Sequence, residues 1–238
     1  MMPVKRVDHM GKKGNVRHFK SLSAPLYLGI HRKGSVYVTK PNGGRHTIDK
    51  SIALVMLVKR LGIAPENNTE TERIIRRGLI LVNNKVIREP SYPVGLNDII
   101  EIANEKKHFK IGINDRSKIE ISEMQKPDYD NMLYKVTGKY KTKKESIMLR
   151  LHDGSVVKGV KGVDVNDSVI VNSKGAVSKV LKLEKGAKCI VIDGVHAGTS
   201  GKITNITEGS LHIRHSATIQ QKDGKDIITI VKNMMVME

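Results

Sequence analysis

The sequence is poor in cysteine, in aromatic residues and in long apolar runs. Cys189 is the only cysteine among 238 residues, so no disulfide can form within the chain, and a zinc site would need histidine or carboxylate ligands. With no tryptophan, six tyrosines and two phenylalanines, aromatic stacking cannot be the main way in which the protein binds a nucleic acid. The longest apolar run, Ile52–Val58, is too short to cross a bilayer. No apolar segment follows the basic N-terminus, so we expect no signal peptide.

Acidic residues are scarce relative to basic ones. The chain has 42 Lys and Arg against 24 Asp and Glu, a formal net charge of +18. A net charge of this size is unusual in a free metabolic enzyme, because like charges repel one another and oppose compaction. We therefore expect a permanent polyanionic partner. Nucleic acid is the first candidate and an anionic membrane the second. The length suggests one or two ordinary domains, and hydrophobic residues at 39% allow a packed core.

Half of the excess charge lies in the first fifth of the chain. Residues 1–50 carry a net charge of +9, whereas residues 51–110, 111–180 and 181–238 carry +3, +4 and +2. The basic residues of the first stretch follow no regular period and alternate with glycine, which indicates a basic arm; a disordered solubilising tail is the alternative. The apolar side chains between Phe19 and Leu28 are too many for such a tail. We therefore expect residues 19–40 to pack on another part of the protein.

Two short helices are predicted after the arm. Apolar residues recur at the spacing of one helix face within residues 54–61, and Asp49 or Ser51 can cap the start of this helix. A second helix is predicted to begin at a capping box formed by Thr69 and Glu72.

The remaining elements are predicted to be strands. Asn83-Asn84 and Asp153-Gly154 each separate two apolar runs, which predicts two tight hairpins. Cys189 lies in an apolar run and is expected in the core. Beyond residue 110 the expected strands cover residues 132–136, 147–151, 156–160, 169–171, 177–183, 189–192, 202–206, 211–215 and 227–231.

Residues 69–102 carry the most specific pattern. The strings TETERIIRRGLILVNNKVI and PVGLNDIIEI resemble the S-four RNA-binding fold, in which two helices and a hairpin present basic residues to folded RNA. Arg73, Arg76 and Arg77 are spaced to share one helix face, and Lys85 and Arg88 belong to the adjacent hairpin. An ordinary solvated face is the alternative.

A glycine pattern near the C-terminus resembles a KOW motif, a small SH3-like barrel element. Its residues are Lys185-Gly186, Val191, Gly194, Gly198 and Gly201-Lys202-Ile203. Generic turn glycines are the alternative. A phosphate-binding Walker loop is excluded, because His196 stands where its first glycine would be and Ile203 follows Lys202 instead of Ser or Thr.

The arm string KGNVRHFKSLSAPLY and the order of these units resemble the archaeal and eukaryotic small-subunit ribosomal protein S-four-e family. Phe19, Ser21 and Tyr27 stand where that family has Leu, Arg and Trp. The resemblance implies a structural constituent of the small ribosomal subunit in the cytoplasm. It also implies small-subunit rRNA and neighbouring ribosomal proteins as partners, with no membrane and no small-molecule substrate.

The expected fold is α+β and multi-domain. Residues 1–48 form a basic N-terminal arm, 49–110 a small S-four-like αβ RNA-binding domain, 111–184 a central β domain and 185–238 a C-terminal SH3-like KOW β-barrel. We expect no catalysis, no cofactor and no metal. The candidate RNA-binding residues are Lys5, Arg6, Lys12, Lys13, Arg17, His18, Lys20, Lys59, Arg60, Arg73, Arg76, Arg77, Lys85 and Arg88.

Three other functions were weighed. An RNA-modifying enzyme with an S-four targeting module would need a positioned acid, for which only Asp115 and Asp153 are candidates, and the G-R-L-D string of pseudouridine synthases is absent. A transcription-associated KOW factor would bind RNA polymerase. Membrane-surface binding would need a basic amphipathic helix, and residues 51–61 carry too few charges for one.

Overall fold

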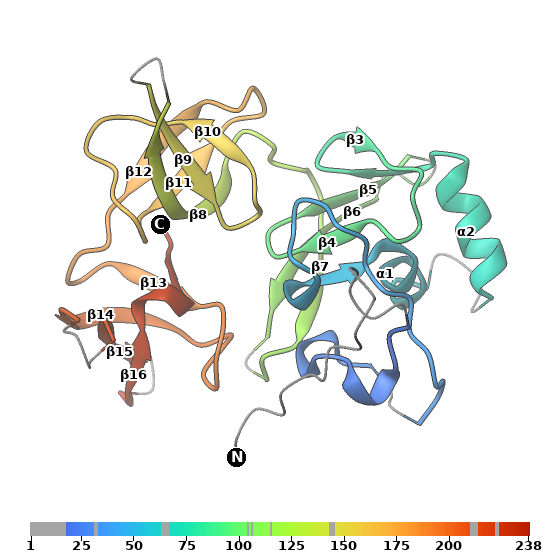
Figure 1. The fold of residues 1–238 in the computed structure, drawn as a ribbon, viewed down its shortest axis with the longest axis horizontal. Coiled ribbons are helices and arrows are strands. Elements are labelled where there is room, and N and C mark those ends of the chain that lie inside the picture. The colour runs from blue at the N-terminus through green and yellow to red at the C-terminus, as the bar shows by residue number, and fades with distance from the viewer. Residues whose placement is uncertain are drawn as a thin grey trace, which may run out of the picture.

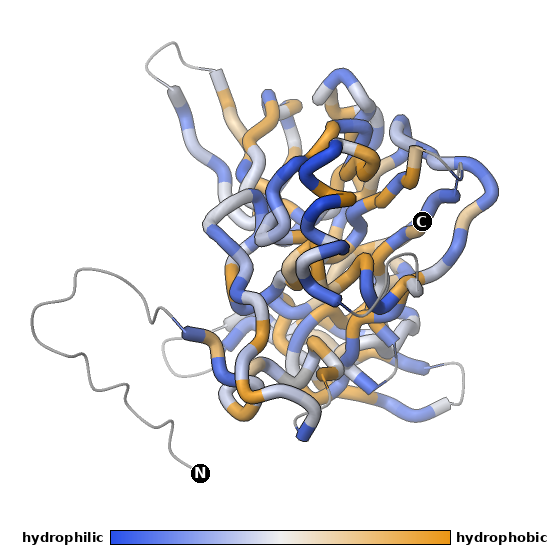
Figure 2. The backbone as a smooth tube through the Cα atoms, turned by 90° about the vertical axis from the view of Figure 1, so that its right-hand side faces the viewer, coloured by the Kyte–Doolittle hydropathy of each residue, from blue (hydrophilic) through white to orange (hydrophobic). Residues whose placement is uncertain are grey.

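The structure is a computed structural model that describes residues 18–30, 33–62, 67–103, 105, 107–114, 116–142, 146–209, 214–221 and 224–238. These residues form two α-helices, a two-stranded ladder and three five-stranded antiparallel sheets, so the molecule is α+β and mostly β. We call residues 49–124, which hold both α-helices and the first sheet, the helical unit; the central and C-terminal sheets lie within residues 132–181 and 188–236. Figure 1 shows the central sheet above the C-terminal sheet, with the helical unit beside both. In Figure 2 hydrophobic segments run through the interior, whereas many loops at the periphery are hydrophilic.

The described part of the arm, residues 18–48, packs on the helical unit. Ala24 and Leu28 are buried in the same core as the two helices, and Phe19 and Tyr27 pack against that core. The Tyr27 hydroxyl donates a hydrogen bond of 2.8 Å to the Ser51 carbonyl. The expectation that residues 19–40 pack on the body is thereby confirmed for residues 19–30. Val36 and Val38 bond instead to Ser21 and Phe19 of the arm itself, and Val36 and Tyr37 are exposed.

The first helix starts later than predicted. Helix α1 covers Leu54–Arg60 and has Ala53 at its N-cap, because Ser51–Ala53 form strand β1 and pair with strand β4, Pro93–Gly95. Neither Asp49 nor Ser51 caps the helix: the Ser51 hydroxyl bonds instead to the Thr47 carbonyl. The paired backbone of β1 fixes residues 51–53 in an extended conformation, so the helix begins only after it.

Helix α2, Asn68–Arg76, is also capped differently from the prediction. Asn67 is the N-cap, and its side chain accepts a hydrogen bond of 3.1 Å from the Thr69 N–H. The predicted capping box of Thr69 and Glu72 is therefore wrong, because both residues lie inside the helix. Gly78, with φ of +79°, ends this segment as expected.

The first sheet continues past the expected domain boundary. Its strands, in spatial order, are β3 (Lys85–Val86), β2 (Ile80–Val82), β5 (Ile99–Ile102), β6 (Lys107–Ile113) and β7 (Ile119–Met124). The boundary expected after residue 110 falls inside β6, which pairs with β5 on one side and β7 on the other. This unit therefore extends through Met124. The Asn83-Asn84 hairpin is confirmed, with φ of 50° and 61° at its two turn residues.

The central unit is a five-stranded sheet around its own core. The spatial order is β10 (Val156–Lys158), β9 (Ile147–Leu151), β8 (Met132–Lys141), β11 (Ser168–Val171) and β12 (Val177–Leu181). The expected strands are found here; β8 runs five residues beyond its expected end at 136, and the others differ by at most two residues at an end. Val136, Leu149, Val163 and Val169 are fully buried in its core.

The C-terminal unit forms the third sheet. The order is β16 (Asp226–Ile230), β15 (Ser216–Gln221), β14 (Ser200–Thr207), β13 (Lys188–Val191) and β17 (Met234–Val236). The strand expected at 211–215 lies largely outside the described residues, and β15 begins at Ser216. Within the described residues β16 and β17 are unpaired edges, so the expected barrel is an open sheet here. Cys189 is buried in this core, as predicted, and burial raises the pKa of its thiol to about 11.

Polar contacts join the three units. The buried Lys135 ammonium of the central unit donates to the carbonyls of Val231, Lys232 and Met234, at 2.7, 2.8 and 2.7 Å. Lys50 of the helical unit forms an ion pair of 2.8 Å with Asp193 of the C-terminal unit. Together they hold the units in one arrangement.

Candidate nucleic-acid interface

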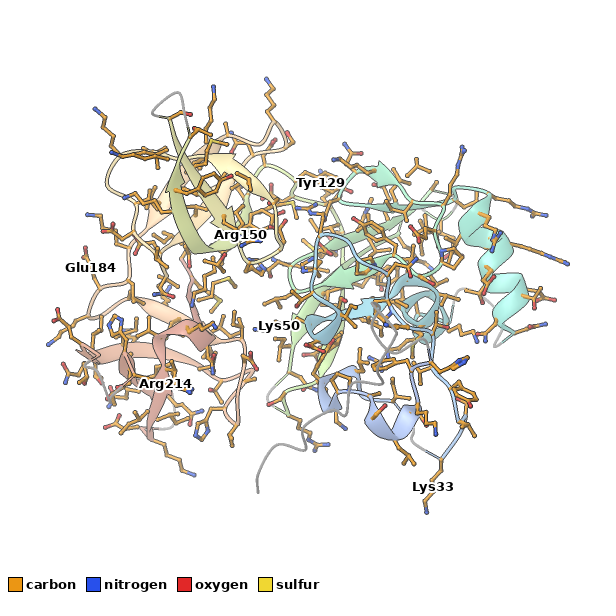
Figure 3. The ribbon with its side chains drawn as sticks, viewed as in Figure 1. Lys33, Lys50, Tyr129, Arg150, Glu184 and Arg214 are labelled. Atoms are coloured by element: carbon orange, nitrogen blue, oxygen red, sulfur yellow. The ribbon has the colours of Figure 1, made fainter. Side chains whose placement is uncertain are left out.

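Five exposed basic side chains gather where α2 ends and the β2–β3 hairpin folds back. We call this the α2–β3 surface; it consists of Arg73, Arg76, Arg77, Lys85 and Arg88, all exposed. In Figure 3 long side chains project outward from α2 on the side facing away from the other two units.

Gly78 brings the two parts of this surface together. A Cβ atom on Gly78 would lie 3.0 Å from Val86 Cγ1 and 3.3 Å from Arg88 Nε. Val86 and Arg88 of the hairpin segment therefore lie next to Gly78, two residues after the end of α2. The grouping of the five residues into one RNA contact stays a prediction.

Arg76 of this surface forms an ion pair with Glu72, and this pair leaves the guanidinium available to a phosphate. Arg76 is 3.5 Å from Glu72, one helical turn earlier, and the two side chains are 68% and 40% exposed. An exposed pair of this kind contributes at most about 1 kcal/mol, so a phosphate can compete for the guanidinium.

Lys59 and Arg60, at the end of α1, both bond to protein atoms. Lys59 Nζ donates to the Asn68 side chain, next to the start of α2. The Arg60 guanidinium donates to the Leu28 carbonyl and, at 3.2 Å, to the Gly29 carbonyl, and burial lowers its pKa. Arg60 thus anchors the arm, a contact that the sequence does not announce because 32 residues separate Arg60 from Leu28.

The described part of the arm presents a second basic area. His18 and Lys20 are exposed. The centre of the His18 ring lies 5.6 Å from that of the Tyr37 ring, and the backbones of Lys20 and Tyr37 form an isolated antiparallel β-bridge. Lys20 and Lys33 line a hollow of about 190 Å³ together with Leu22, which is 74% exposed. The candidates Lys5, Arg6, Lys12, Lys13 and Arg17 lie outside the described residues.

The carboxylate weighed as a catalytic acid is structural. Asp153 is fully buried and accepts hydrogen bonds from the Ser155 N–H and hydroxyl, at 2.9 and 2.7 Å, and from the Arg45 side chain. Burial alone would raise the pKa of Asp153, but Ser155 and Arg45 hold it below its usual range. Asp115 lies outside the described residues.

No other constellation for chemistry is found in the described part of the chain. It contains no group of three or more His, Cys, Asp or Glu residues placed to hold a metal ion. None of its helices is long and apolar enough to cross a membrane.

Comparisons with known proteins agree with this geometry. The S4 domain family matches residues 54–100, which include α1, α2 and the β2–β3 hairpin. The chain is 31% identical over 221 residues to "Small ribosomal subunit protein eS4" of Archaeoglobus fulgidus, with 92% of each chain covered. It is 29% identical to the protein of that name from Desulfurococcus amylolyticus, with 92% of this chain and 91% of the relative covered.

A solved structure shares the fold. The crystal structure of the 30S ribosomal protein S4e from Thermoplasma acidophilum superimposes with a TM-score of 0.66 at 24% identity. The match covers 79% of this chain and 95% of that one, so the fold is shared over most of this chain.

Proposed function

This chain belongs to the eS4 family of small ribosomal subunit proteins, and from that premise we propose that it binds folded small-subunit rRNA through the α2–β3 surface and the arm. It is a structural constituent of the small subunit and not an enzyme, and rRNA and neighbouring ribosomal proteins are its partners. The finer assignment of residues to RNA contacts is the proposal.

The observation that carries the proposal is the cluster of five exposed cations at one place on the S4 domain. Folded RNA offers phosphates, 2′-hydroxyls and shape, because its deep groove is too narrow for side chains to read. Arg73, Arg76 and Arg77 come from one helix end and Lys85 and Arg88 from the hairpin segment that follows Gly78, which gives an exposed basic surface. Such a surface can dock where RNA helices meet.

Two further assignments belong to the same proposal. The basic residues of the arm, Lys5 to Lys20, would neutralise phosphates between RNA segments, and the +9 charge of residues 1–50 supports this. Residues 185–238 would act as a KOW unit. Its glycine spacing supports this, and its open five-stranded sheet with β17 beside β13 is compatible with it.

The test is a triple substitution, Arg73→Ala with Arg76→Ala and Arg77→Ala, measured by binding to a folded small-subunit rRNA fragment over a range of salt. Each neutralised phosphate contributes roughly 0.7–0.9 to the log–log salt slope, so the slope should fall by about 2 to 3. Replacing the exposed Lys174, Lys182 and Lys225 with Ala removes the same charge elsewhere and should leave the slope nearly unchanged. An unchanged slope in the arginine variant would place the main contact elsewhere.

A further inference from the structure

One face of the central sheet is exposed and carries aromatic, apolar and cationic side chains. Leu149 of β9 and Val157 of β10 point into the core, so their neighbours along each strand point outward. The register places Tyr140 beside Met148 and Met148 beside Lys158, and in the next row Gly138 beside Arg150 and Arg150 beside Val156. We call these six residues the central sheet face.

The apolar part of this face is open to solvent. Tyr140 is 46% exposed and Val156 is 43% exposed, although both are large hydrophobic side chains. Both residues are therefore accessible to a partner.

The charged part of this face is of one sign. Strands β8, β9 and β10 contain five basic residues and no Asp or Glu. Lys135 is buried, and Lys139 turns to the Val163 carbonyl at 2.8 Å and to Asp164 at 3.5 Å. Arg150 and Lys158 are exposed on the outward face, and Figure 3 shows Arg150 on the central sheet.

Because Gly138 has no side chain, the sheet surface beside Tyr140 is open. A Cβ atom there would meet only the Arg150 Cβ, at an ordinary distance of 3.7 Å, and the backbone of Gly138 is in a conformation open to other residues. Neither crowding nor backbone strain therefore requires glycine. Glycine inside a strand often marks a bulge or a place where a ligand approaches closely, and the pairing of β8 with β9 shifts register between Val136 and Gly138.

We propose that the central sheet face binds unpaired nucleotides of RNA, a second contact that rests on the proposed function. A base stacks on Tyr140 above Gly138, and Arg150 and Lys158 contact the flanking phosphates. Aromatic side chains on a basic sheet surface bind single strands in this way. A protein partner fits less well, because the face has only two exposed apolar side chains and no acidic one.

The experiment measures binding of a fluorescently labelled oligouridylate to the full chain by anisotropy at several salt concentrations. Tyr140→Ala should weaken binding roughly tenfold and leave the salt slope unchanged, because stacking neutralises no phosphate. Tyr140→Phe keeps the ring and should bind as the wild type does. Lys158→Ala should lower the slope by about 0.7.

Gly138→Val provides the sharpest variant. Valine favours strands and fits the open space, so the free energy of unfolding should stay the same or rise, while the side chain covers the stacking position. Weaker binding without loss of stability separates a binding role from a structural one. If Tyr140→Ala and Gly138→Val both bind oligouridylate as the wild type does, the inference is overturned.

The two proposals fail separately. The arginine triple variant tests the α2–β3 surface on folded rRNA, whereas the Tyr140 and Gly138 variants test the sheet on a single strand. Tyr140→Ala could bind oligouridylate as the wild type does and yet lose a crosslink to a neighbouring protein in assembled subunits. That pair of results would assign the face to a protein and overturn the RNA assignment.

Discussion

Buried polar residues fasten the units of this protein to one another. The His46 ring lies 2.9 Å from the Asp98 carboxylate, and both residues are buried at the base of the arm. Arg45, the neighbouring residue, pairs with Asp153 of the central unit. The segment that leads out of the arm therefore holds the helical and central units together.

His152 gives this junction a dependence on pH. Burial lowers the pKa of His152 to about 4 from 6.5, although Asp153 opposes the shift, and its Nδ1 accepts a hydrogen bond of 3.2 Å from the Lys135 N–H. Between these two values the unfolded chain binds more protons than the folded one, so the free energy of unfolding falls as the pH falls. The loss attributable to His152 between pH 7 and 5 should be about 2 kcal/mol.

Urea denaturation at the two pH values checks this. His152→Gln should lose about 2 kcal/mol less than the wild type on the same pH change. His18→Gln, a change at an exposed histidine, should lose as much as the wild type. Equal losses in all three proteins would show that His152 does not titrate in this range.

At single positions, local sequence signals predicted the environment of a residue but not its distant partner. Cys189 in an apolar run indicated the core, and Asp153 before Gly154 indicated a turn; both are confirmed. The pairing of Asp153 with Arg45 joins residues 108 positions apart, and no periodicity in a single sequence contains that information.

Elements whose ends are set by local chemistry were predicted well. The Asn83-Asn84 hairpin and the segment ended by Gly78 depend on positive φ at those residues, which Asn and Gly tolerate. Strands β1, β4, β6, β7 and β17 were not predicted. The conformations of β1 and β17 come from pairing with β4 and β13, which are more than about 40 residues away along the chain. The ends of α1 and of the first sheet were misplaced for the same reason.

Two residues compete as the N-cap of α2: Asn67, as the structure has it, and Thr69, as the capping box predicted. Asn67→Ala removes the side chain that accepts from the Thr69 N–H and should lower the free energy of unfolding by about 1 kcal/mol. Thr69→Ala should change it by less than about half of that, because Thr69 is not the cap. Thermal denaturation of both variants decides. A larger loss for Thr69→Ala would restore the capping box.

At the scale of the whole molecule, polar contacts join units that each have a hydrophobic core of their own. The Lys135 ammonium occupies three carbonyls of the C-terminal unit, while burial lowers its pKa to about 7. The Ser168 hydroxyl of the central unit accepts a hydrogen bond of 3.0 Å from the Val236 N–H in β17. The C-terminal sheet thus depends on the central unit for its position.

Lys135→Met tests this dependence. It removes the ammonium donor from three carbonyls, of which that of Val231 keeps the Met234 N–H as a donor, and should cost about 1–3 kcal/mol, while hydrogen exchange at β17 becomes faster. Lys139→Met removes a lysine that bonds within the central unit and should leave β17 unchanged. Protection at β17 that is equal in both variants would mean that Lys135 does not hold the unit.

Gly95 packs tightly against His46, near the end of the arm, and this packing restricts which residues the position can accept. A Cβ atom on this glycine would lie 2.5 Å from Cγ of the His46 ring, and its N–H donates to Asp98 at 2.9 Å. A single added methyl group would have to push the imidazole off its carboxylate before anything else could adjust. We expect this position to resist replacement across generations, while substitutions accumulate more freely at the exposed positions of the three sheets.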